Sequence, residues 1–332
     1  MENKCQKWYF RTRLQYLSLV WKMSFSIENY DRKYLDGMVK QYNDETSFEP
    51  YIAKLNSDLF IKLVEEKSYF DPKAVFVAIE KGRVIGWIHA CLASGSEAWH
   101  NPEKKVPHIR MLIFAKEQIK VGQTLVTEAN KWLKQSGQNK FLAIHAEVGY
   151  PFYRGLWLGG EPMGSSAMPH IQLAFEYGGY KNTQESIFMT AKMLGLPREI
   201  KSNAKLEMIT SKTNITHKTM QESWAGFEPM TTQTYIGNDL VGSIGWTIIP
   251  YLVDKLGASC LNIWSLGIKE EYRGKGIATT LVSDVMIQAY KLGARFASVG
   301  TQFWNVPAYM TYAKLGFIPY QLVIGRTLEF AG

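Results

Sequence analysis

The stretch "SLGIKEEYRGKGIATTLV", Ser265–Val282, joins an apolar segment to a helical pattern through a loop that holds two glycines. In such a strand–loop–helix unit, several main-chain N–H groups point outward at the positive end of the helix dipole. Gly274 and Gly276 let a ligand approach the backbone, while Arg273 and Lys275 add positive charge. The stretch therefore predicts an anion site suited to phosphates, with a solvated turn that caps a helix as the alternative.

Two common phosphate-binding patterns fit this loop poorly. A Walker loop needs GxxxxGK followed by Ser or Thr, but Gly276 follows Lys275, and Lys269 replaces the first glycine. A dinucleotide fingerprint needs GxGxxG, but Thr279 takes the third glycine position, and Val299 stands where an acidic residue is expected. The first pattern is excluded and the second is weak.

The chain contains the same unit twice. Residues 75–90 and 232–246 each predict a β-hairpin, with an apolar run on either side of a glycine-containing turn. Gly86 and Gly242 in these hairpins have the same separation as Gly137 and Gly293, which end the two predicted helices. A register kept over this distance predicts two similar domains, each ordered as hairpin, strand, loop, helix, strand and short helix.

The repeat and the composition divide the chain into three parts. Residues 1–22 form an N-terminal extension, 23–200 the first domain and 201–332 the second, with the polar, Gly- and Pro-containing residues 195–206 as a linker. Residues 1–22 resemble a signal peptide only in part, since Gln15 breaks the apolar run and a small-residue cleavage site is missing. We interpret them as upstream sequence or a loose tail, with a docked amphipathic helix as the alternative.

The composition limits the classes of function. The chain has 332 residues, of which 46% are apolar and 20% charged, so it is long enough for two soluble domains. Cys5, Cys91 and Cys260 show no CxxC or Cys/His spacing, which favours a cytoplasmic protein without disulfides or metal. The net charge is +8, but residues 1–22 carry half of it. Neither nucleic acid nor a membrane is therefore expected as a partner.

Two linked motifs resemble those of the GNAT superfamily of acyl-CoA N-acyltransferases. Arg273, Gly276 and Ala278 match its pattern Arg/Gln-x-x-Gly-x-Gly/Ala, and "NVPAYMTYAKLGF", Asn305–Phe317, matches N-x-x-A-x-x-x-Y-x-x-x-G-F. The resemblance is strong over residues 205–332 and reaches residues 23–193 through the repeat. It implies an α+β fold of two tandem GNAT domains, each with a mixed sheet splayed between two strands, and acetyl-CoA bound in a cleft.

The resemblance also implies which residues bind acetyl-CoA. Loop amides would hold the pyrophosphate, the strand before the loop would pair with the pantetheine arm, and Asn305 would contact that arm from the other side. Glu270 departs from the family by replacing a proline before the loop, which affects loop rigidity more than chemistry. The expected contacts are Leu266, Gly267, Ile268, Arg273, Gly274, Lys275, Gly276, Ile277, Ala278, Thr279 and Asn305.

The catalytic group implied by the resemblance is Tyr312. The family places its general acid at this position, where a phenol would protonate the leaving thiolate; the alternative is a core aromatic on the last helix. A main-chain N–H between Leu266 and Ile268 would face the thioester oxygen. No general base is identified, since Glu228, Glu270 and Glu271 fit surface positions equally well.

The first copy of the loop lacks the features of the second. Glu117, Lys120 and Gly122 align with Arg273, Gly276 and Ala278, so we expect the N-terminal domain to bind no coenzyme A. That domain also carries an insertion, residues 149–170, rich in glycine and aromatic residues. We interpret it either as interdomain packing or as a loop that shapes an acceptor pocket, in which case the expected substrate contacts are Arg154, Trp157 and Glu161.

The leading hypothesis is an N-acetyltransferase with one active site in the C-terminal domain. It would transfer an acetyl group from acetyl-CoA to a primary amine of a small molecule or peptide, acting as a monomer or homodimer. Because a fold does not fix a substrate, transfer of an aminoacyl or longer acyl group stays open. So does a non-catalytic protein that binds coenzyme A as a sensor or scaffold.

Overall fold

The structure is a computed structural model that describes residues 24–94, 105–145, 151–157, 164–224 and 226–330. The predicted extension 1–22, part of the insertion 149–170 and Glu161 lie outside the described residues. The helices are α2 Leu35–Thr46, α3 Ser57–Phe60, α4 Ile119–Lys134, α5 Pro169–Tyr177, α6 Lys218–Ser223, α7 Val253–Leu256, α8 Ile277–Lys291 and α9 Val306–Ala313.

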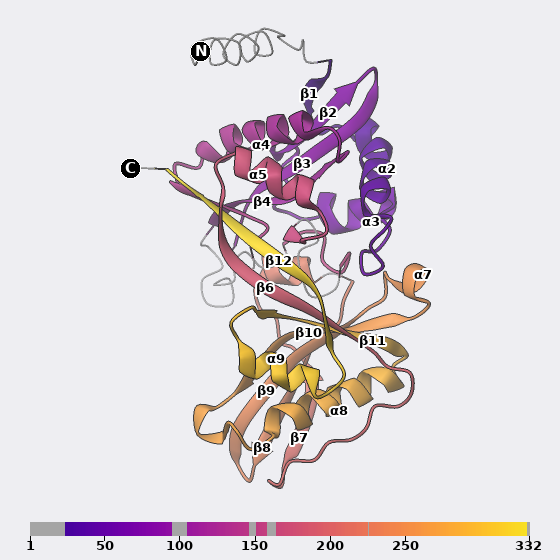
Figure 1. Cartoon of the computed structure of the whole chain (residues 1–332), viewed down its shortest axis with the longest axis vertical. Coiled ribbons are helices and arrows are strands. Elements are labelled where there is room, and N and C mark those ends of the chain that lie inside the picture. The colour runs from indigo at the N-terminus through magenta and orange to yellow at the C-terminus, as the bar shows by residue number, and fades with distance from the viewer. Residues whose placement is uncertain (1–23, 95–104, 146–150, 158–163, 225, 331–332) are drawn as a thin grey trace, which may run out of the picture.

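Twelve strands form one mixed sheet that runs through the molecule (Figure 1). Their order is β1-β2-β3-β4-β5-β12-β6-β11-β10-β9-β8-β7. Their bounds are β1 Ser26–Asn29, β2 Val75–Glu80, β3 Arg83–Ser94, β4 Lys105–Phe114, β5 Lys140–Ala143, β6 Lys181–Lys192, β7 Glu207–Lys212, β8 Met230–Ile236, β9 Asp239–Ile249, β10 Ser259–Ile268, β11 Ala294–Gln302 and β12 Ile318–Glu329.

The local predictions from the sequence are confirmed. Both hairpins form, β2–β3 around Lys81 and Gly82, and β8–β9 around Gly237 and Asn238. The turn glycines have positive φ angles, +76° at Gly82 and +58° at Gly237, a backbone region that glycine enters without strain. The amphipathic helices α4 and α8 follow β4 and β10, so each half has the expected order of elements.

The two halves exchange their last strands, which the sequence did not predict. Strand β12, from the end of the chain, lies between β5 and β6, while β6 from the N-terminal half pairs with β11. Figure 1 shows β6 and β12 crossing together between the two halves. The expected pair of separate sheets is therefore one continuous sheet, because each half supplies an edge that only the other half's strand covers.

The hydrophobic core follows this exchange. One cluster contains the side chains packed between the N-terminal sheet and α2, α4 and α5, and Val323 of β12 belongs to it. The other packs α8 and α9 against the C-terminal sheet and includes Met189, Ala191 and Met193 from the end of β6. Each core is thus completed by residues from the other half of the sequence.

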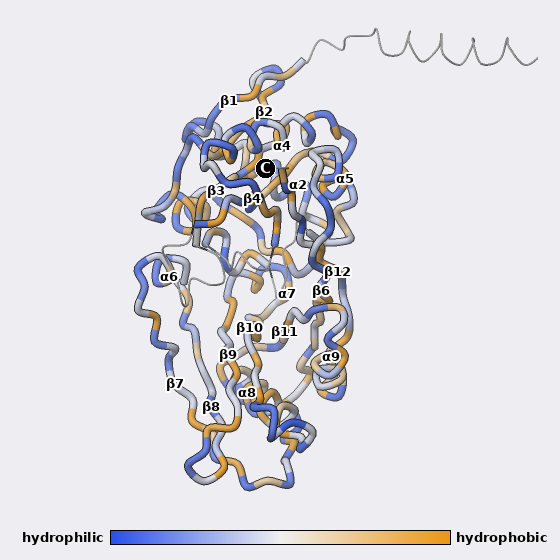
Figure 2. The backbone as a smooth tube through the Cα atoms, turned by 90° about the vertical axis from the view of Figure 1, so that its left-hand side faces the viewer, coloured by the Kyte–Doolittle hydropathy of each residue, from blue (hydrophilic) through white to orange (hydrophobic). Residues whose placement is uncertain are grey.

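The described part of the chain contains no helix that is long and apolar enough to cross a membrane. In Figure 2, apolar residues lie along strands in each half of the molecule.

Candidate active site

The strand β10 parts from its parallel neighbour β11 halfway along its length. Register pairs join the two strands from Ser259 to Ile263, and no pair within the described sheet joins β11 to the following residues, 264–268. Leu266, Gly267 and Ile268 still pair with β9 on the opposite edge. One edge of this predicted segment is therefore open, and an extended ligand can add to it by main-chain hydrogen bonds.

The loop between β10 and α8 has the open backbone conformation that the predicted anion site requires. Residues 269–276 leave the strand, form a short 3-10 turn at Glu270–Tyr272, and reach the first residue of α8, Ile277. Gly274 and Gly276 have φ angles of +76° and +78°, and no atom lies within 4 Å of the position of an added Cβ on either residue. Both glycines are thus required by backbone conformation, and the space around them is open.

The main-chain N–H groups at the end of this loop and the start of α8 have no hydrogen-bond acceptor among the described residues. Gly276 is the N-cap of α8, and because it has no side chain, it gives no capping hydrogen bond. Within the described chain, no acceptor satisfies the N–H groups from Gly274 through Thr279, a span that contains Lys275, Ile277 and Ala278. A row of unpaired donors at the positive end of a 15-residue helix suits a phosphate.

The cations of the loop are held at the rim of the site. The Arg273 Nε donates to the Ile268 carbonyl at 3.2 Å, which fixes the guanidinium at the end of β10. The Lys275 Nζ donates to the Glu271 carbonyl at 3.1 Å and lies 5.0 Å from the centre of the Tyr272 ring. Both side chains are exposed, so they add long-range attraction for an anion rather than a buried contact.

A residue that the sequence did not indicate supports the loop. Ser202, in the predicted linker, donates from its Oγ to the Lys275 carbonyl at 2.9 Å. The linker also bonds to α8, because the Ser283 Oγ donates to the Arg198 carbonyl and accepts from the Ile200 N–H. The segment between the two halves therefore packs along α8, and no local pattern in it signals this role.

Tyr312 lies on α9 with 4% of its surface exposed, packed in the C-terminal core beside Phe317. Burial raises the pKa of its hydroxyl to about 12, so the phenol carries its proton at neutral pH. No hydrogen bond joins this hydroxyl to any other described residue. The environment keeps the side chain in the form that a general acid requires, while the ring also serves the core.

Asn305, predicted to contact the pantetheine arm, has a structural role in this fold. It is the N-cap of α9, and its side-chain oxygen accepts a hydrogen bond from the Ala308 N–H at 3.3 Å. This bond orients the start of α9, which carries Tyr312 two turns later.

The predicted substrate contacts divide between two environments. Trp157 is 6% exposed and buried in the N-terminal core, where it bridges to Ile52 and lies 5.9 Å from the Arg110 guanidinium. Arg154 instead faces the C-terminal half: its guanidinium lies 3.8 Å from the centre of the Trp224 ring, and its Nε donates to the Ser223 carbonyl. Of these two residues, Arg154 is therefore the one that lies against the C-terminal half.

The insertion also packs the two halves together, which was the other interpretation of its composition. At Gly155, where φ is +81°, an added Cβ would lie 2.3 Å from the Phe227 ring. Only glycine permits this approach of the insertion to the C-terminal half.

The corresponding loop in the N-terminal half is shorter. Residues 115–118 connect β4 to α4, half as many as connect β10 to α8. Gly86 pairs with Phe114 at the end of β4, whereas Gly242 pairs with Ile268, so β4 runs two residues further than the sequence alignment implies. Lys120, which aligns with Gly276, consequently lies inside α4 and does not adopt the positive φ angle of Gly276.

Side chains fill the space beside this shorter loop. The Phe114 ring covers the start of α4 so closely that an added Cβ on Gly122 would lie 2.4 Å from it. The same ring stacks edge-on with His170, which approaches Glu45 at 3.8 Å. Burial, and next the charge of Glu117, raise the pKa of the Glu45 carboxyl. This arrangement lacks the open space that the C-terminal loop has.

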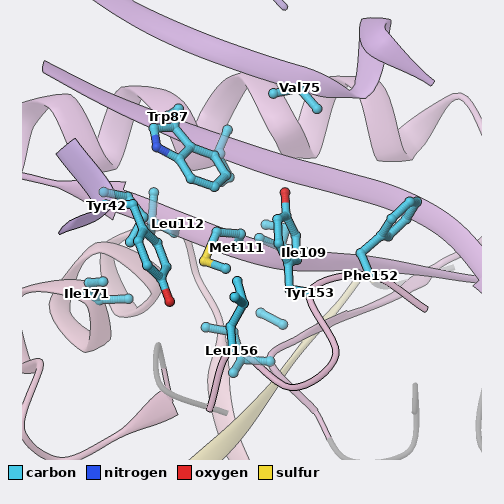
Figure 3. Packing of buried hydrophobic residues seen from close by; sticks show 14 of the residues in the cluster. Tyr42, Val75, Trp87, Ile109, Met111, Leu112, Phe152, Tyr153, Leu156 and Ile171 are labelled. Atoms are coloured by element: carbon cyan, nitrogen blue, oxygen red, sulfur yellow. The ribbon is translucent and has the colours of Figure 1, made fainter. Parts of the chain in front are cut away.

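The insertion also occupies the place where β4 parts from β5. These strands pair only at His108 and Ile109, and the insertion packs beyond that point. Phe152, Tyr153 and Leu156 are fully buried, and Figure 3 shows Tyr153 and Leu156 beside Ile109 and Met111 of β4.

Two histidines in this N-terminal core predict a loss of stability in acid. His89 and His108 are buried, and burial lowers the pKa of each to about 3 from an unfolded value of 6.5. The unfolded chain therefore takes up more protons than the folded chain between these values, and stability falls as the pH falls from 6.5 toward 3. At pH 5 we expect each histidine to cost about 2 kcal/mol of unfolding free energy.

Urea denaturation at pH 7 and pH 5 measures this effect. The His89→Gln/His108→Gln double variant should show a smaller difference between the two pH values, whatever its absolute stability. His217→Gln, on the segment before α6, serves as the control. Equal pH dependence in the double variant and the natural sequence would contradict the assignment.

The described residues give no clear general base and no metal site. Glu228 forms a surface ion pair with Lys212 at 2.8 Å, and Glu270 and Glu271 are exposed in the loop. Across the described ranges, no three His, Cys, Asp or Glu side chains gather in a group that could hold a metal ion.

Comparison with known proteins agrees with this geometry. Residues 204–317 match the family model described as "Acetyltransferase (GNAT) family". These residues contain the open segment of β10, the glycine loop and Tyr312, so this part of the chain matches the GNAT acetyltransferase family. This family places the chain among the acyltransferases and implies an acyl-CoA co-substrate with an amine acceptor. No curated protein sequence matches the chain.

Solved structures extend the likeness of fold to the whole chain. A GCN5-related N-acetyltransferase from Sphaerobacter thermophilus has a TM-score of 0.62 at 11% identity, covering 92% of this chain and 96% of the other. A tandem GNAT protein from the clavulanic acid biosynthesis pathway has a TM-score of 0.59 at 14% identity, covering 93% and 99%. An N-myristoyltransferase of Saccharomyces cerevisiae, solved with myristoyl-CoA, has a TM-score of 0.55 at 11% identity, covering 92% and 78%. The tandem GNAT fold is therefore shared across both halves.

Proposed function

We propose that this protein transfers an acetyl group from acetyl-CoA to a primary amine of a small molecule or peptide, at one active site in the C-terminal half. The observation that carries the proposal is the pair of open features next to each other, the unpaired edge of β10 and the loop Gly274–Gly276 at the start of α8. The first suits the pantetheine arm and the second suits the pyrophosphate.

The chain would supply two groups that acyl transfer uses, a donor for the oxyanion and an acid for the thiolate. Acetyl-CoA, when bound, brings an activated thioester. A main-chain N–H of residues 266–268 facing the open edge would stabilise the oxyanion, a contribution of about 3 kcal/mol for a donor of this kind. The neutral amine would attack the thioester carbon and lose a proton to water as the carbon–sulfur bond breaks. Tyr312, protonated at neutral pH, would donate its proton to the leaving thiolate and regain one from water. Holding amine and thioester side by side would supply much of the remaining acceleration.

The proposal of a single site rests on the contrast between the two halves. The N-terminal loop is short, its helix begins without a positive-φ glycine, and Phe114 covers it. We propose that this half serves as a scaffold that carries the insertion to the junction of the two halves.

Calorimetric titration with acetyl-CoA, followed by a thiol-release assay on a panel of amines, tests the function. Micromolar binding and turnover of an amine are expected. Titrating propionyl-, aminoacyl- and myristoyl-CoA in parallel distinguishes an acetyltransferase from an enzyme that transfers longer acyl groups or aminoacyl groups. Binding without turnover on any amine would favour a sensor or scaffold, and no binding of any acyl-CoA would refute the proposal.

Tyr312→Phe tests the acid. Removing the hydroxyl should lower kcat by about 100-fold or more while the affinity for acetyl-CoA stays nearly unchanged, because the ring keeps its packing. Tyr309→Phe, on the same helix, is the matched control and should leave kcat unaltered. In the natural sequence, kcat should fall through loss of the Tyr312 proton only as the pH nears 12. Equal loss of binding and turnover in Tyr312→Phe would reassign the residue to packing.

A further inference from the structure

A line of three side chains joins the insertion to the open edge of β10. The Arg154 guanidinium lies over the Trp224 ring, with 3.8 Å to its centre. The Trp224 ring in turn meets the Trp264 ring, at 5.7 Å between centres and a tilt of 58°. Trp264 is the first residue of β10 beyond the last pair with β11. Residues that are far apart in the sequence therefore meet beside the proposed site of acyl transfer.

The middle member of this line is an unsatisfied hydrogen-bond donor. Trp224 is 5% exposed, and its Nε1 is buried without a partner in the described chain. An indole N–H can only donate, and a buried donor left unpaired costs free energy. The hydroxyl of Tyr251, close to the same segment next to Gly226, is also buried and unpaired. Both atoms are covered by protein, so an oxygen atom of a ligand could accept from them only after the side chains around them shift.

Three cations, Arg154, Lys62 and Lys67, lie around these donors, together with the carboxylates of Glu66 and Glu222. Lys67 is 5% exposed, and its Nζ donates to the Glu222 carbonyl. Burial lowers the pKa of Lys67, while the charges of Glu222 and Glu66 raise it and the charge of Arg154 lowers it. Lys62 reaches the same place, since its Nζ lies 2.9 Å from the position of an added Cβ on Gly226.

The one carboxylate bonded within this group is already engaged. The two oxygens of Glu222 accept from the Ser68 N–H at 2.7 Å and from the Ser68 Oγ at 2.8 Å. These bonds fix α6 to the N-terminal half, and Figure 2 shows α6 at the level where the halves meet.

We infer that the acceptor is an amine that carries an oxyanion, a carboxylate or a phosphate, bound at Trp224 and Arg154. Its amine would then lie toward Trp264 and the open edge of β10, within reach of an acyl group held there. The inference rests on the proposed function, and it narrows the acceptor from any primary amine to an anionic one. Two buried donors and three cations would be unsuited to a neutral or polycationic amine.

The test measures binding separately from turnover. Amines are titrated calorimetrically into the full chain, with and without saturating coenzyme A, which binds without transferring a group. Each acceptor is paired with its analogue that lacks the oxyanion: phenylalanine with phenylethylamine, lysine with cadaverine, and phosphoethanolamine with ethanolamine. The oxyanion member of at least one pair should bind about 10-fold tighter or more, and comparing the pairs distinguishes carboxylate from phosphate.

Variants assign the preference to the named residues. Arg154→Gln and Trp224→Phe should each remove the preference within a pair and leave the analogue's binding unaltered. Arg154→Lys should retain part of it, which separates loss of charge from loss of folding. Lys33→Gln removes an exposed cation of the N-terminal half and should change nothing.

The outcomes also separate this inference from the proposed function. Turnover of amines with no preference within any pair would overturn the inference and leave the acetyltransferase in place. A preference that depends on Arg154 and Trp224, without turnover, would support the oxyanion site and refute the proposed reaction. The inference would also be overturned if Arg154→Gln weakened the binding of both members of a pair by the same factor.

Discussion

Gly276→Glu should abolish binding of acetyl-CoA. The φ angle of Gly276 is +78°, so any side chain there is strained, and the loop would have to move to relieve it. The substitution also places a carboxylate at the start of α8, where it would take the unpaired N–H groups for itself and repel a phosphate. Calorimetric titration should show at least a 100-fold rise in Kd, equivalent to about 2.7 kcal/mol or more.

Gly82→Glu is the matched control for this variant. Gly82 lies in the hairpin β2–β3 with a φ angle of +76°, and no atom lies within 4 Å of its Cβ position. The substitution therefore introduces the same strain and the same charge far from the loop. Acetyl-CoA should bind Gly82→Glu as tightly as the natural sequence. Binding retained by Gly276→Glu would mean that the pyrophosphate is held elsewhere.

Neither half of the chain should fold by itself. A fragment of residues 201–330 lacks β6, so β11 loses its neighbour and the C-terminal core loses Met189 and Met193. Burying a methionine side chain is worth about 1.5–3 kcal/mol, and a whole domain is stable by only about 5–15 kcal/mol. A fragment of residues 24–200 in turn lacks β12, which covers both β5 and β6.

Expression of the two fragments, separately and together, measures this dependence. Each fragment alone should be insoluble or fail to unfold cooperatively, whereas co-expressed fragments should form a soluble complex by restoring β12 between β5 and β6. The uncut chain is the control. A C-terminal fragment that is monomeric, folded and binds acetyl-CoA without the other half would contradict the expectation.

The sequence by itself determined the local features of this protein. The hairpins, the helix α8 and the loop Gly274–Gly276 depend on residues within a few positions of one another, since turns, helix ends and positive-φ glycines are set by neighbours in the chain. The two motifs that resemble the GNAT family can also be recognised in the sequence, because each lies within one continuous stretch of residues. The position of Tyr312 on α9 follows from spacing alone, although its raised pKa follows from the core around it.

Only the tertiary structure decided which strands pair and what fills each half. Strands β6 and β12 each end one half of the chain, and the pairing of either with β5 depends on contacts between the halves rather than on its own residues. The filling of the N-terminal half by Tyr153, and the contacts of Arg154, Trp224 and Trp264, join residues from distant parts of the chain. Such contacts depend on the packing of whole elements, which no local pattern of residues specifies.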